Sequence, residues 1–461
     1  MIYTSTSKNY SLSCFGYIFN PNSQSPSWFK QWRKRCGALM VNKSIVFIFI
    51  ITTSIFSFLA YKPADVVIAG PLMTDQDLFD EELEILSEAT GLKIKYIELI
   101  DVEDYLINDN SNSEVDLALI PNPQGVVNLG ERNIIIPISK LVNDIELMKN
   151  FSNHLINITT SEKTKENYGV FFRLLPNSFI WYDIEKFQEA GSPVFQSYED
   201  MVSFTRERAN NGNETWCLDS ESGASTGWIA TNWLEDLILH EYGPEIYDAW
   251  SQQSLLPGSK EVILSINEIG KLIFIENGVY GGNERIVRKE FRNNFINLLS
   301  DETDCIFSWS GQYADYYMPE GTEFGIEYDF FKFPSSKNPD AMVGIGDILV
   351  ALNSNSNSLI IFEKLISVQF GSSWMLNENS SYVPANMNNN NLVSNKLLIK
   401  QIELTKKALR KDIFRYDASE VMERRIGADK LLASLKEYID LGSEEAYKNL
   451  ELIIEDLQSS F

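Results

Sequence analysis

Short apolar runs and amphipathic segments alternate along residues 64–130. Val66–Ala69 is a β-branched run followed by the turn Gly70–Pro71, which predicts a buried strand. Thr74 stands three residues before an aspartate in a capping-box-like arrangement and predicts that a helix begins there. The next predicted elements are a helix with Phe79, Leu83 and Leu86 that Gly91 closes, a strand with Leu92, Ile94 and Tyr96, and a strand over Val115–Ile120.

This order of strands and helices predicts a parallel sheet with right-handed crossovers. Ligands bind such sheets beyond the carboxyl ends of the strands, which here are Gly70–Asp75 and Pro121–Gly125. Further strands are predicted at 169–172, 179–182, 305–309, 325–333 and 346–352, with helices at 198–209, 228–239 and 261–276. From Lys396 the pattern predicts nearly continuous helix with breaks at Gly427 and Gly442. We therefore predict an α/β protein with two lobes and a helical C-terminus.

An uncharged apolar run covers residues 45–60 between two lysines. Its length is short for a bilayer span of about 20 residues and typical of the apolar region of a secretory signal. We therefore predict export, and Met40 as well as Met1 is a candidate start. Ala60 suits the last position before cleavage, but Phe58 is large for the position two residues earlier, so an uncleaved anchor stays open as the alternative.

Charge is distributed unevenly between this N-terminal extension and the rest of the chain. The 461 residues, enough for two or three domains, carry 64 acidic and 39 basic side chains, for a formal charge of −25. Residues 1–62 hold seven of the basic side chains and no acidic one, so the remainder has 32 basic against 64 acidic. A body this acidic repels phosphate backbones, which excludes nucleic acid as a partner.

The cysteine and histidine counts restrict the chemistry further. Two histidines exclude a His-rich metal site, and four cysteines are too few for a disulfide scaffold. If the signal is removed, Cys14 and Cys36 leave with it, and Cys217 and Cys305 remain as an even pair in an oxidising compartment. We predict a disulfide between these two residues, with two buried thiols as the alternative.

Motifs for nucleotide or acyl-transfer chemistry are absent from the sequence, which contains no GxxxxGK[ST] loop, no GxGxxG after a strand and no GxSxG elbow. No cofactor and no metal are therefore predicted. A glycosidase carboxylate pair stays open, since Glu221 or Asp236 could serve, but no spacing singles out a pair. Tryptophans near predicted turns suit stacking on sugar rings. Trp233 and Trp250, which lie inside or at the end of helical stretches, are assigned to packing.

The segment Trp216–Tyr242, WCLDSESGASTGWIATNWLEDLILHEY, resembles the extracellular solute-binding proteins of carbohydrate ABC importers. The likeness is greatest to the α-glucoside-type branch of the maltose-binding-like family. Several other pieces agree with that family in the same order: VVIAGP at Val66–Pro71, VDLALIPNPQG at Val115–Gly125, FIWYDIEKFQEAG at Phe179–Gly191, GPEIYDAW at Gly243–Trp250, NGVYGGNE at Asn277–Glu284, YDFFKFP at Tyr328–Pro334 and GIGDILVAL at Gly344–Leu352.

The resemblance implies a periplasmic-binding-protein-like clamshell with discontinuous lobes. The first lobe would comprise residues 64–178 plus 345–388, and the second 179–344 plus 389–461. It also implies ligand contacts in loops that face the cleft, and a paired Cys217 and Cys305. The residues implied to bind ligand are Asn122, Gln124, Trp181, Glu221, Ser225, Thr226 and Trp228, followed by Gly281, Gly282, Trp309, Gln312 and Asp347. Asp116 is expected to be a structural partner beneath the loop that follows its strand.

Two departures from the family pattern touch the cleft: Leu72 stands where the family often has Trp, and Phe307–Ser310 replaces a His or Arg. The resemblance implies a monomeric periplasmic protein that catalyses nothing, closes around a small neutral sugar or osmolyte and delivers it to an ABC permease. An α-glucoside, trehalose, sucrose or glucosylglycerol is preferred over a long maltodextrin. The rival hypotheses are a secreted glycosidase, which would turn over α-glucosides, and a structural envelope protein, which would show no saturable ligand.

Overall fold

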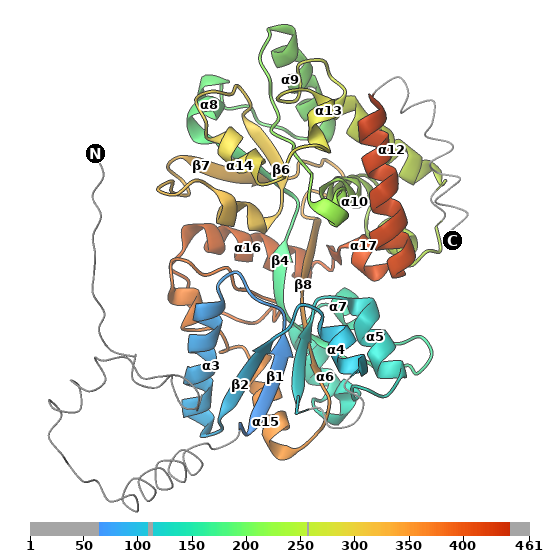
Figure 1. Ribbon diagram of the computed structural model, residues 1–461, viewed down its shortest axis with the longest axis vertical. Coiled ribbons are helices and arrows are strands. Elements are labelled where there is room, and N and C mark those ends of the chain that lie inside the picture. Colours follow the sequence, from blue (N-terminus) through green and yellow to red (C-terminus); the bar gives the residue numbers. More distant parts are fainter. Residues whose placement is uncertain (1–63, 109–113, 256–257, 443–461) are drawn as a thin grey trace, which may run out of the picture. The chain divides into compact units, whose positions relative to one another are not determined.

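Two β-sheets organise the protein in the computed structural model, which describes residues 64–108, 114–255 and 258–442 (Figure 1). The larger sheet is seven-stranded with the order β2-β1-β3-β8-β4-β9, and β10 pairs with β8 off this path. Its strands are β1 (Val66–Gly70), β2 (Ile94–Glu98), β3 (Leu117–Ile120), β4 (Val170–Pro176), β8 (Met342–Ala351), β9 (Val383–Pro384) and β10 (Phe414–Tyr416). The smaller sheet has the order β6-β5-β7, formed by Phe307–Ser310, Phe179–Asp183 and Tyr328–Lys332. The predicted signal or anchor segment lies outside the described residues.

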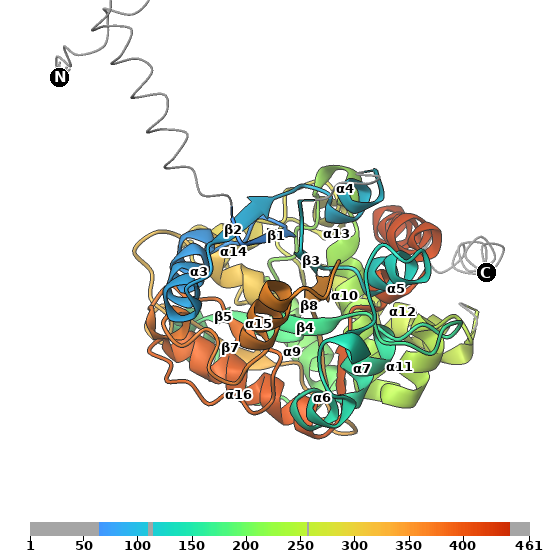
Figure 2. The ribbon, with the colours of Figure 1, turned by 90° about the horizontal axis from the view of Figure 1, so that it is seen from below.

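The first three strands are parallel, as their alternation with helices predicts. Gly70 pairs with Glu98 on one side of β1, and Ile68 pairs with Leu117 on the other. The strand β8 then runs antiparallel to both β3 and β4, so the sheet is mixed. Figure 2 shows α3 and α15 on one side of this sheet and α4 and α5 on the other, which buries both faces.

The helices of the first part of the chain are α3 (Gln76–Thr90), α4 (Val102–Asn108), α5 (Pro123–Glu131), α6 (Asp144–Asn150) and α7 (Asn153–Ile158). Those of the second part are α8 (Ile184–Glu189), α9 (Tyr198–Asn210), α10 (Trp228–Tyr242), α11 (Pro244–Ser251), α12 (Lys260–Ile273), α13 (Asn283–Ile286) and α14 (Asn293–Leu298). After β8 come α15 (Ser356–Leu365), α16 (Lys396–Arg410) and α17 (Ala418–Val421). Shorter helical turns are η1 (Ile138–Lys140), η2 (Gly223–Ser225), η3 (Gln312–Tyr317), η4 (Trp374–Leu376) and η5 (Arg425–Leu431).

The start of α3 differs from the prediction. The helix begins at Gln76, and its N-cap position is occupied by Asp75, so Thr74 does not cap it. The Asp75 carboxylate does not bond the helix either, because it accepts hydrogen bonds from a distant segment instead. The predicted end is confirmed: Gly91 has a φ of 69° and donates its N–H to the carbonyl of Ser87.

Asp116 is the structural partner that the sequence analysis expects. Its carboxylate accepts the N–H of Val67 at 2.9 Å, and so fastens β1 beside β3. Its other oxygen accepts the amide of Asn353 at 2.9 Å. Asn355 in the same loop caps α15 by accepting the N–H of Ser358. The Asn/Ser-rich loop is therefore a helix start that is tied to the sheet.

The predicted disulfide between Cys217 and Cys305 is present, with Cα atoms 5.6 Å apart. The two segments it joins are also hydrogen-bonded, since the N–H of Cys217 donates to the carbonyl of Phe307 at 2.8 Å. The crosslink therefore holds the start of β6 against the segment that leads to the loop before α10. Trp233 and Trp250 are buried in the core, which confirms their assignment to packing.

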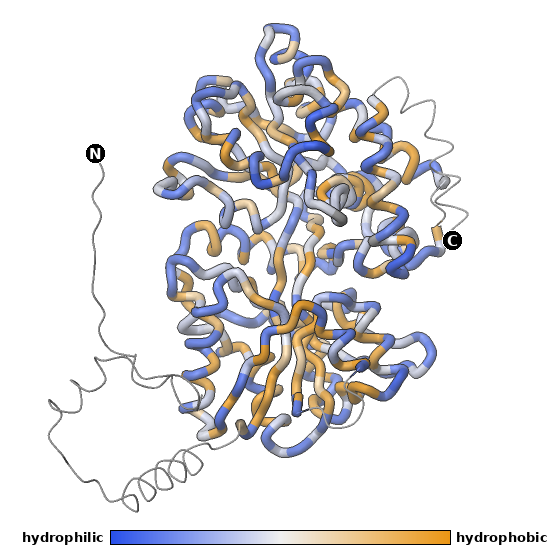
Figure 3. The backbone as a smooth tube through the Cα atoms, viewed as in Figure 1, coloured by the Kyte–Doolittle hydropathy of each residue, from blue (hydrophilic) through white to orange (hydrophobic). Residues whose placement is uncertain are grey.

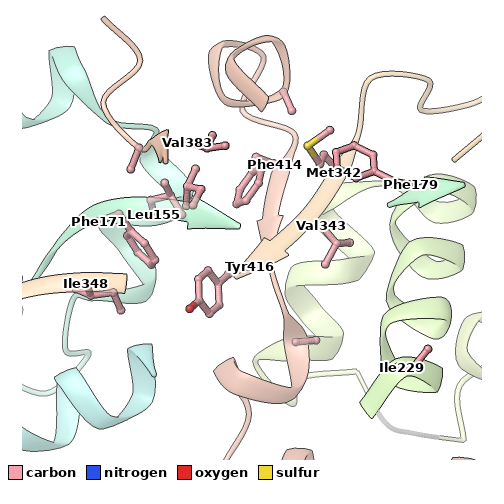
Figure 4. Packing of buried hydrophobic residues seen from close by; sticks show 14 of the residues in the cluster. Leu155, Phe171, Phe179, Ile229, Met342, Val343, Ile348, Val383, Phe414 and Tyr416 are labelled. Carbon is pink, nitrogen blue, oxygen red and sulfur yellow. The ribbon is translucent and has the colours of Figure 1, made fainter. Parts of the chain in front are cut away.

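The C-terminal part is less continuously helical than predicted, because β10 interrupts it. Phe414–Tyr416 pairs in parallel with Met342–Gly344 at the start of β8. Figure 4 shows Phe414 and Tyr416 among buried apolar side chains from both parts of the chain. Aromatic residues favour strands, and this packing outweighs the helical spacing of the neighbouring residues.

Hydrophobic residues concentrate along the strands of the larger sheet, while the helices alternate between hydrophobic and polar residues (Figure 3). The buried core continues from the first sheet into the second. Among the residues that the structure describes, no helix combines the length and the apolar composition that crossing a membrane requires.

Candidate ligand-binding site

A buried ion pair lies on two neighbouring strands of the larger sheet. Arg173 of β4 stands directly opposite Asp347 of β8, and its Nε donates to Oδ2 of that carboxylate at 2.5 Å. The side chain of Arg173 is 5% exposed and that of Asp347 is 4% exposed. Burial alone acts to lower the pKa of Arg173, but Asp347 and then Asp75 outweigh it and raise that pKa. The guanidinium is therefore charged at every ordinary pH.

Asp75 approaches the same guanidinium from the N-terminus of α3, with its Oδ1 3.8 Å from Nη1 of Arg173. Its Oδ2 accepts the indole N–H of Trp374 at 2.6 Å and the backbone N–H of Ser381 at 2.8 Å. Trp374 is in turn placed by Glu82, whose carboxylate accepts its backbone N–H at 3.1 Å. Residues from α3, η4 and the segment before β9 therefore converge on Arg173.

Gln312 extends this group toward the smaller sheet. It opens η3 directly after β6, and its amide donates to the carbonyl of Ser381 at 2.7 Å. We call Asp75, Arg173, Asp347, Gln312 and Ser381 the Arg173 cluster. It joins strands of the larger sheet to the turn that follows β6.

Buried polar atoms of the Arg173 cluster retain hydrogen-bonding capacity. Within the part of the chain that the structure describes, four of them make no hydrogen bond: Asp75 Oδ1, Arg173 Nη1, Gln312 Oε1 and Ser381 Oγ. A buried donor or acceptor that lacks a hydrogen bond costs roughly 1–3 kcal/mol of stability, and more when it is charged. Two acceptors, a charged donor and a hydroxyl are thus available, which matches a ligand whose groups both donate and accept.

Tyr96 borders the cluster from β2. Its hydroxyl donates to the carbonyl of Pro71 at 2.7 Å, which fixes the loop after β1. Burial, followed by the nearby charge of Asp347, raises its pKa far above the ordinary value. Tyr96 therefore stays neutral and adds no charge to the site.

Trp228 lies close to Gln312 in this arrangement. It is the first residue of α10, is partly exposed, and has its ring centroid 5.1 Å from that of Tyr313, the residue after Gln312. Gly227 before it has a φ of 113°, and a Cβ there would lie 2.7 Å from the carbonyl oxygen of Leu432. Only glycine fits this approach, so the loop delivers Trp228 in one direction.

The structure places Trp181 and Trp309, two other predicted ligand residues, inside the second lobe's core. Trp181 donates its indole N–H to the carbonyl of Gly311, and Trp309 donates to Asp236 at 2.7 Å. The ring of Trp309 is stacked between Trp233 and Phe333. These rings are enclosed by protein, and their role in binding stays a prediction.

In the loop before α10, the predicted side chains bond one another's backbone. Glu221 accepts the N–H of Gly223 at 2.8 Å. Thr226 accepts the N–H of Ser222 and donates to the carbonyl of Gly223, while Ser225 is exposed. These contacts set the shape of the loop that carries Trp228.

The other predicted residues lie on separate elements. Asn122 caps α5 by accepting the N–H of Gly125, and Gln124 reaches Asn128 of the same helix at 3.4 Å. Gly281 and Gly282 are exposed and have φ values of 70° and 82° in the turn before α13. The structure thus brings three of the predicted residues, Asp347, Gln312 and Trp228, into one neighbourhood through their contacts with Arg173, Ser381 and Tyr313. It leaves these four residues elsewhere.

No family model matches the chain. The alpha-glucosides-binding periplasmic protein AglE of Rhizobium meliloti is 25% identical to it over 389 residues, which cover 82% of this chain and 84% of that protein. The osmoprotective compounds-binding protein GgtB of a Synechocystis species is 24% identical over 379 residues, 81% of this chain and 88% of that protein.

Solved structures of solute receptors share the fold. The bacterial receptor AcbH, described with an exclusive preference for β-D-galactopyranose, superimposes with a TM-score of 0.69 at 12% identity and covers 86% of this chain and 98% of its own. RafE of Streptococcus pneumoniae gives a TM-score of 0.63 at 12% identity and covers 87% and 98%. The chain is thus similar over 81–82% of its length to two periplasmic binding proteins, and it shares the fold of solved solute receptors. The α/β, two-lobed clamshell predicted from the sequence is confirmed.

Sequence reasoning missed three members of the Arg173 cluster. Arg173 carried a usable signal, because a charged side chain inside the apolar strand VFFRLLP must find a buried partner. Asp75 lies in the segment after β1 that was predicted to face a ligand, but its role as an acceptor was not identified. Ser381 carried no signal, since it sits in a loop and contributes by its position.

The titratable groups of the described residues form no cluster suited to a metal ion. Across the described ranges, no group of three or more His, Cys, Asp or Glu side chains could hold a metal ion. In the Arg173 cluster the carboxylates of Asp347 and Asp75 pair with the guanidinium of Arg173. The atoms of the cluster that have no partner can form hydrogen bonds with a ligand.

Proposed function

We propose that this protein is the exported binding component of an ABC importer and that it captures a small neutral sugar, glucoside or related osmolyte. The observation that carries the proposal is the set of buried, unbonded donors and acceptors in the Arg173 cluster. A sugar hydroxyl can donate to Asp75 and accept from Arg173, so it satisfies atoms whose burial is otherwise costly. The relatives support the class, since one is named for alpha-glucosides and the other for osmoprotective compounds.

The charge of the cluster favours a neutral ligand. Arg173 already lies beside two carboxylates, Asp347 and Asp75, so a ligand carboxylate or phosphate would add a further negative charge to a site with a surplus of one. Such a like-charge approach in a buried site is costly. A neutral polyol meets no such penalty.

Trp228 is proposed as the stacking surface for the sugar ring, with Gln312 and Asp347 on the polar side. Asn122, Gln124, Glu221, Ser225, Thr226, Gly281, Gly282, Trp181 and Trp309 are further proposed contacts. Closure of the two lobes over the ligand would then create the form that the membrane permease recognises. The lobe boundaries, a monomeric state, and export to the periplasm are part of the same proposal.

The glycosidase alternative is not favoured. Glu221 bonds the N–H of Gly223, whereas Asp236 is enclosed by Ser178 and Trp309, so these carboxylates serve separate local networks. The relatives are binding proteins. Release of glucose from trehalose, sucrose or maltose by the purified protein would overturn the proposal.

Calorimetry of the purified chain with trehalose, sucrose, maltose and glucosylglycerol tests the ligand class, with glucuronate as the anionic control. We expect saturable binding of at least one neutral compound and none of glucuronate. No binding to any of these, or binding of glucuronate alone, contradicts the proposal.

Variants then test the site. Trp228→Ala should weaken binding by tenfold or more, about 1.4 kcal/mol, with little change in the ligand-free melting temperature. Gln312→Ala should weaken it similarly, whereas Gln188→Ala, the same change at an exposed position of α8, should not. If Trp228→Ala melts several degrees lower and its folded fraction binds normally, Trp228 is a core residue.

A further inference from the structure

A second group of buried charged side chains lies where the chain leaves β10. Glu235, in the middle of α10, is fully buried, and Asp417, directly after β10, is 6% exposed. The backbone N–H of Ser419 points at both, 3.0 Å from Oδ1 of Asp417 and 3.4 Å from Oε1 of Glu235.

Two carboxylates that share one N–H donor in a buried site repel each other when both are ionised, so one of them is protonated. The pair therefore holds one proton. Asp417 accepts the hydroxyl of Ser419 at 2.6 Å and the N–H groups of Ser419 and Glu420, so its negative charge is well supported. Oε2 of Glu235 has no donor among the described residues. The geometry therefore places the proton on Glu235.

The surroundings of the pair reinforce this assignment. Burial and then the charge of Asp417 raise the pKa of Glu235 well above the ordinary value. Arg415 of β10 is engaged by Asp248 of α11 through bonds of 2.6 and 2.9 Å. The titratable or charged groups that face this region are Asp236 of α10, Tyr247 and Asp248 of α11, Arg415 and Tyr416 of β10, Glu420 of α17, Arg424 before η5, Glu103 of α4, Asp347 of β8 and His154 of α7.

The pair sits on a segment that connects several elements. α17 contacts α5 and α11, and in Figure 1 it lies between α10 and α5. The hydroxyl of Tyr247 donates to the carbonyl of Tyr416 at 2.9 Å, which holds α11 to the same segment. Toward the larger sheet, Glu420 faces Glu103, and Glu103 is hydrogen-bonded to Asn122 at the start of α5.

We propose that Glu235 and Asp417 share one proton and act as a proton-sensitive latch that holds α17 against α10. Loss of the proton puts two negative charges in one buried site, and their repulsion separates α17 from α10. The latch is distinct from the Arg173 cluster, whose opposite charges need no proton. It is therefore independent of which ligand the protein binds.

The direction of the pH effect follows from the protonated state. A carboxyl group whose pKa is raised in the folded protein gives stability that is fully present below its unfolded pKa, near 4.3, and that is lost as the pH rises through the folded value. Burial, followed by Asp417 and Glu103, also raises the pKa of Glu420, to about 7. The latch should therefore weaken from about pH 5 upward, through neutral pH and beyond.

Hydrogen exchange of the ligand-free full chain at pH 6, 7 and 8 tests the latch. After correction for the intrinsic pH dependence of exchange, the amides of residues 417–421 should exchange up to tenfold faster per pH unit, as expected for release of one proton. Glu235→Gln keeps a donor for Asp417 but has no proton to lose at this position, so its corrected exchange should rise less steeply with pH than that of the wild type, by the contribution of Glu420 alone. Glu245→Gln, the same change at an exposed position of α11, should behave as the wild type.

Parallel pH profiles for the wild type and Glu235→Gln would overturn the proposal. If Glu235→Gln does not fold, the wild type still decides, by infrared spectroscopy of protein labelled with ¹³C at glutamate carboxyls. A protonated glutamate carboxyl band at pH 7 is expected that is larger than Glu420 alone, about half protonated at this pH, can give. Its absence would overturn the proposal, whereas failure to bind sugars would not affect it.

Discussion

The Arg173 cluster and the Glu235–Asp417 pair are both buried groups of charged side chains, but they solve the problem of burial in opposite ways. In the first, Arg173 lies beside Asp347 and Asp75, so a permanent cation offsets part of the negative charge. In the second, two carboxylates meet, and one proton replaces the missing cation. The Arg173 cluster has buried donors and acceptors without a hydrogen bond, which a ligand can satisfy. The Glu235–Asp417 pair instead shares a proton between its own two carboxyl groups and therefore responds to pH.

Removing the cation from the Arg173 cluster should have the largest effect. Arg173→Met leaves Asp347 and Asp75 buried without a positive partner, so we expect a loss of about 3–5 kcal/mol in the free energy of unfolding, measured by urea denaturation. Arg206→Met is the control, since Arg206 is 48% exposed and its pair with Glu199 is 3.6 Å long. That exposed pair should contribute about 0–1 kcal/mol. A loss below about 1 kcal/mol for Arg173→Met would show that the cluster's charges are not interdependent.

The first sheet could be predicted largely from local pattern. Apolar runs, helical spacing and Gly91 are local signals, and they identified β1, α3, β2 and β3 in order. The start of α3 was missed because Asp75 is used by Trp374 and Ser381, which lie about 300 residues away in the chain. The strand β10 was missed for a similar reason, since its partner is the start of β8.

The candidate site was only partly predictable, because its members come from separate segments. Asp347 and Gln312 were proposed from family resemblance, and the structure links them through Arg173, Asp75 and Ser381. The sequence, however, does not reveal whether a face of a tryptophan ring is free to contact a ligand. Trp181 and Trp309 are enclosed, while Trp228 is partly exposed, and this difference depends on packing between distant strands and helices.

A third buried carboxylate, Asp236, gives an intermediate case between the two clusters. Its hydrogen bonds come from neutral donors, the hydroxyl of Ser178 and the indole N–H of Trp309. Burial raises its pKa to about 7, although these two hydrogen bonds act to lower it. Trp309→Phe should therefore cost about 1.5–3 kcal/mol at pH 8, where Asp236 is charged, and less at pH 5, where it is protonated.

The control for this variant is Trp233→Phe. Trp233 donates its indole N–H to the carbonyl of Trp309 at 3.2 Å, which is a neutral acceptor. Its cost should therefore be the same at pH 5 and pH 8 in thermal unfolding. If Trp309→Phe shows no larger loss at the higher pH, Asp236 does not titrate in this range and belongs with the permanently compensated groups.

The smallest effect, and the most specific, is expected for Asp417→Asn. Asparagine caps a helix about as well as aspartate, so the bonds to Ser419 and Glu420 should persist, and stability at pH 5 should change by a few tenths of a kcal/mol. At pH 8 the variant should be more stable than the wild type by up to about 1 kcal/mol, because removal of the Asp417 charge eliminates repulsion of an ionised Glu235.

Asp183→Asn makes the same change at the N-cap of α8, where Asp183 accepts the N–H of Lys186, and its effect should be equal at both pH values. Urea denaturation of both variants at pH 5 and pH 8 measures this difference of differences. A gain at pH 8 only for Asp417→Asn distinguishes a like-charge pair with one proton from an ordinary helix cap, and an equal response of the two variants would assign Asp417 to capping alone.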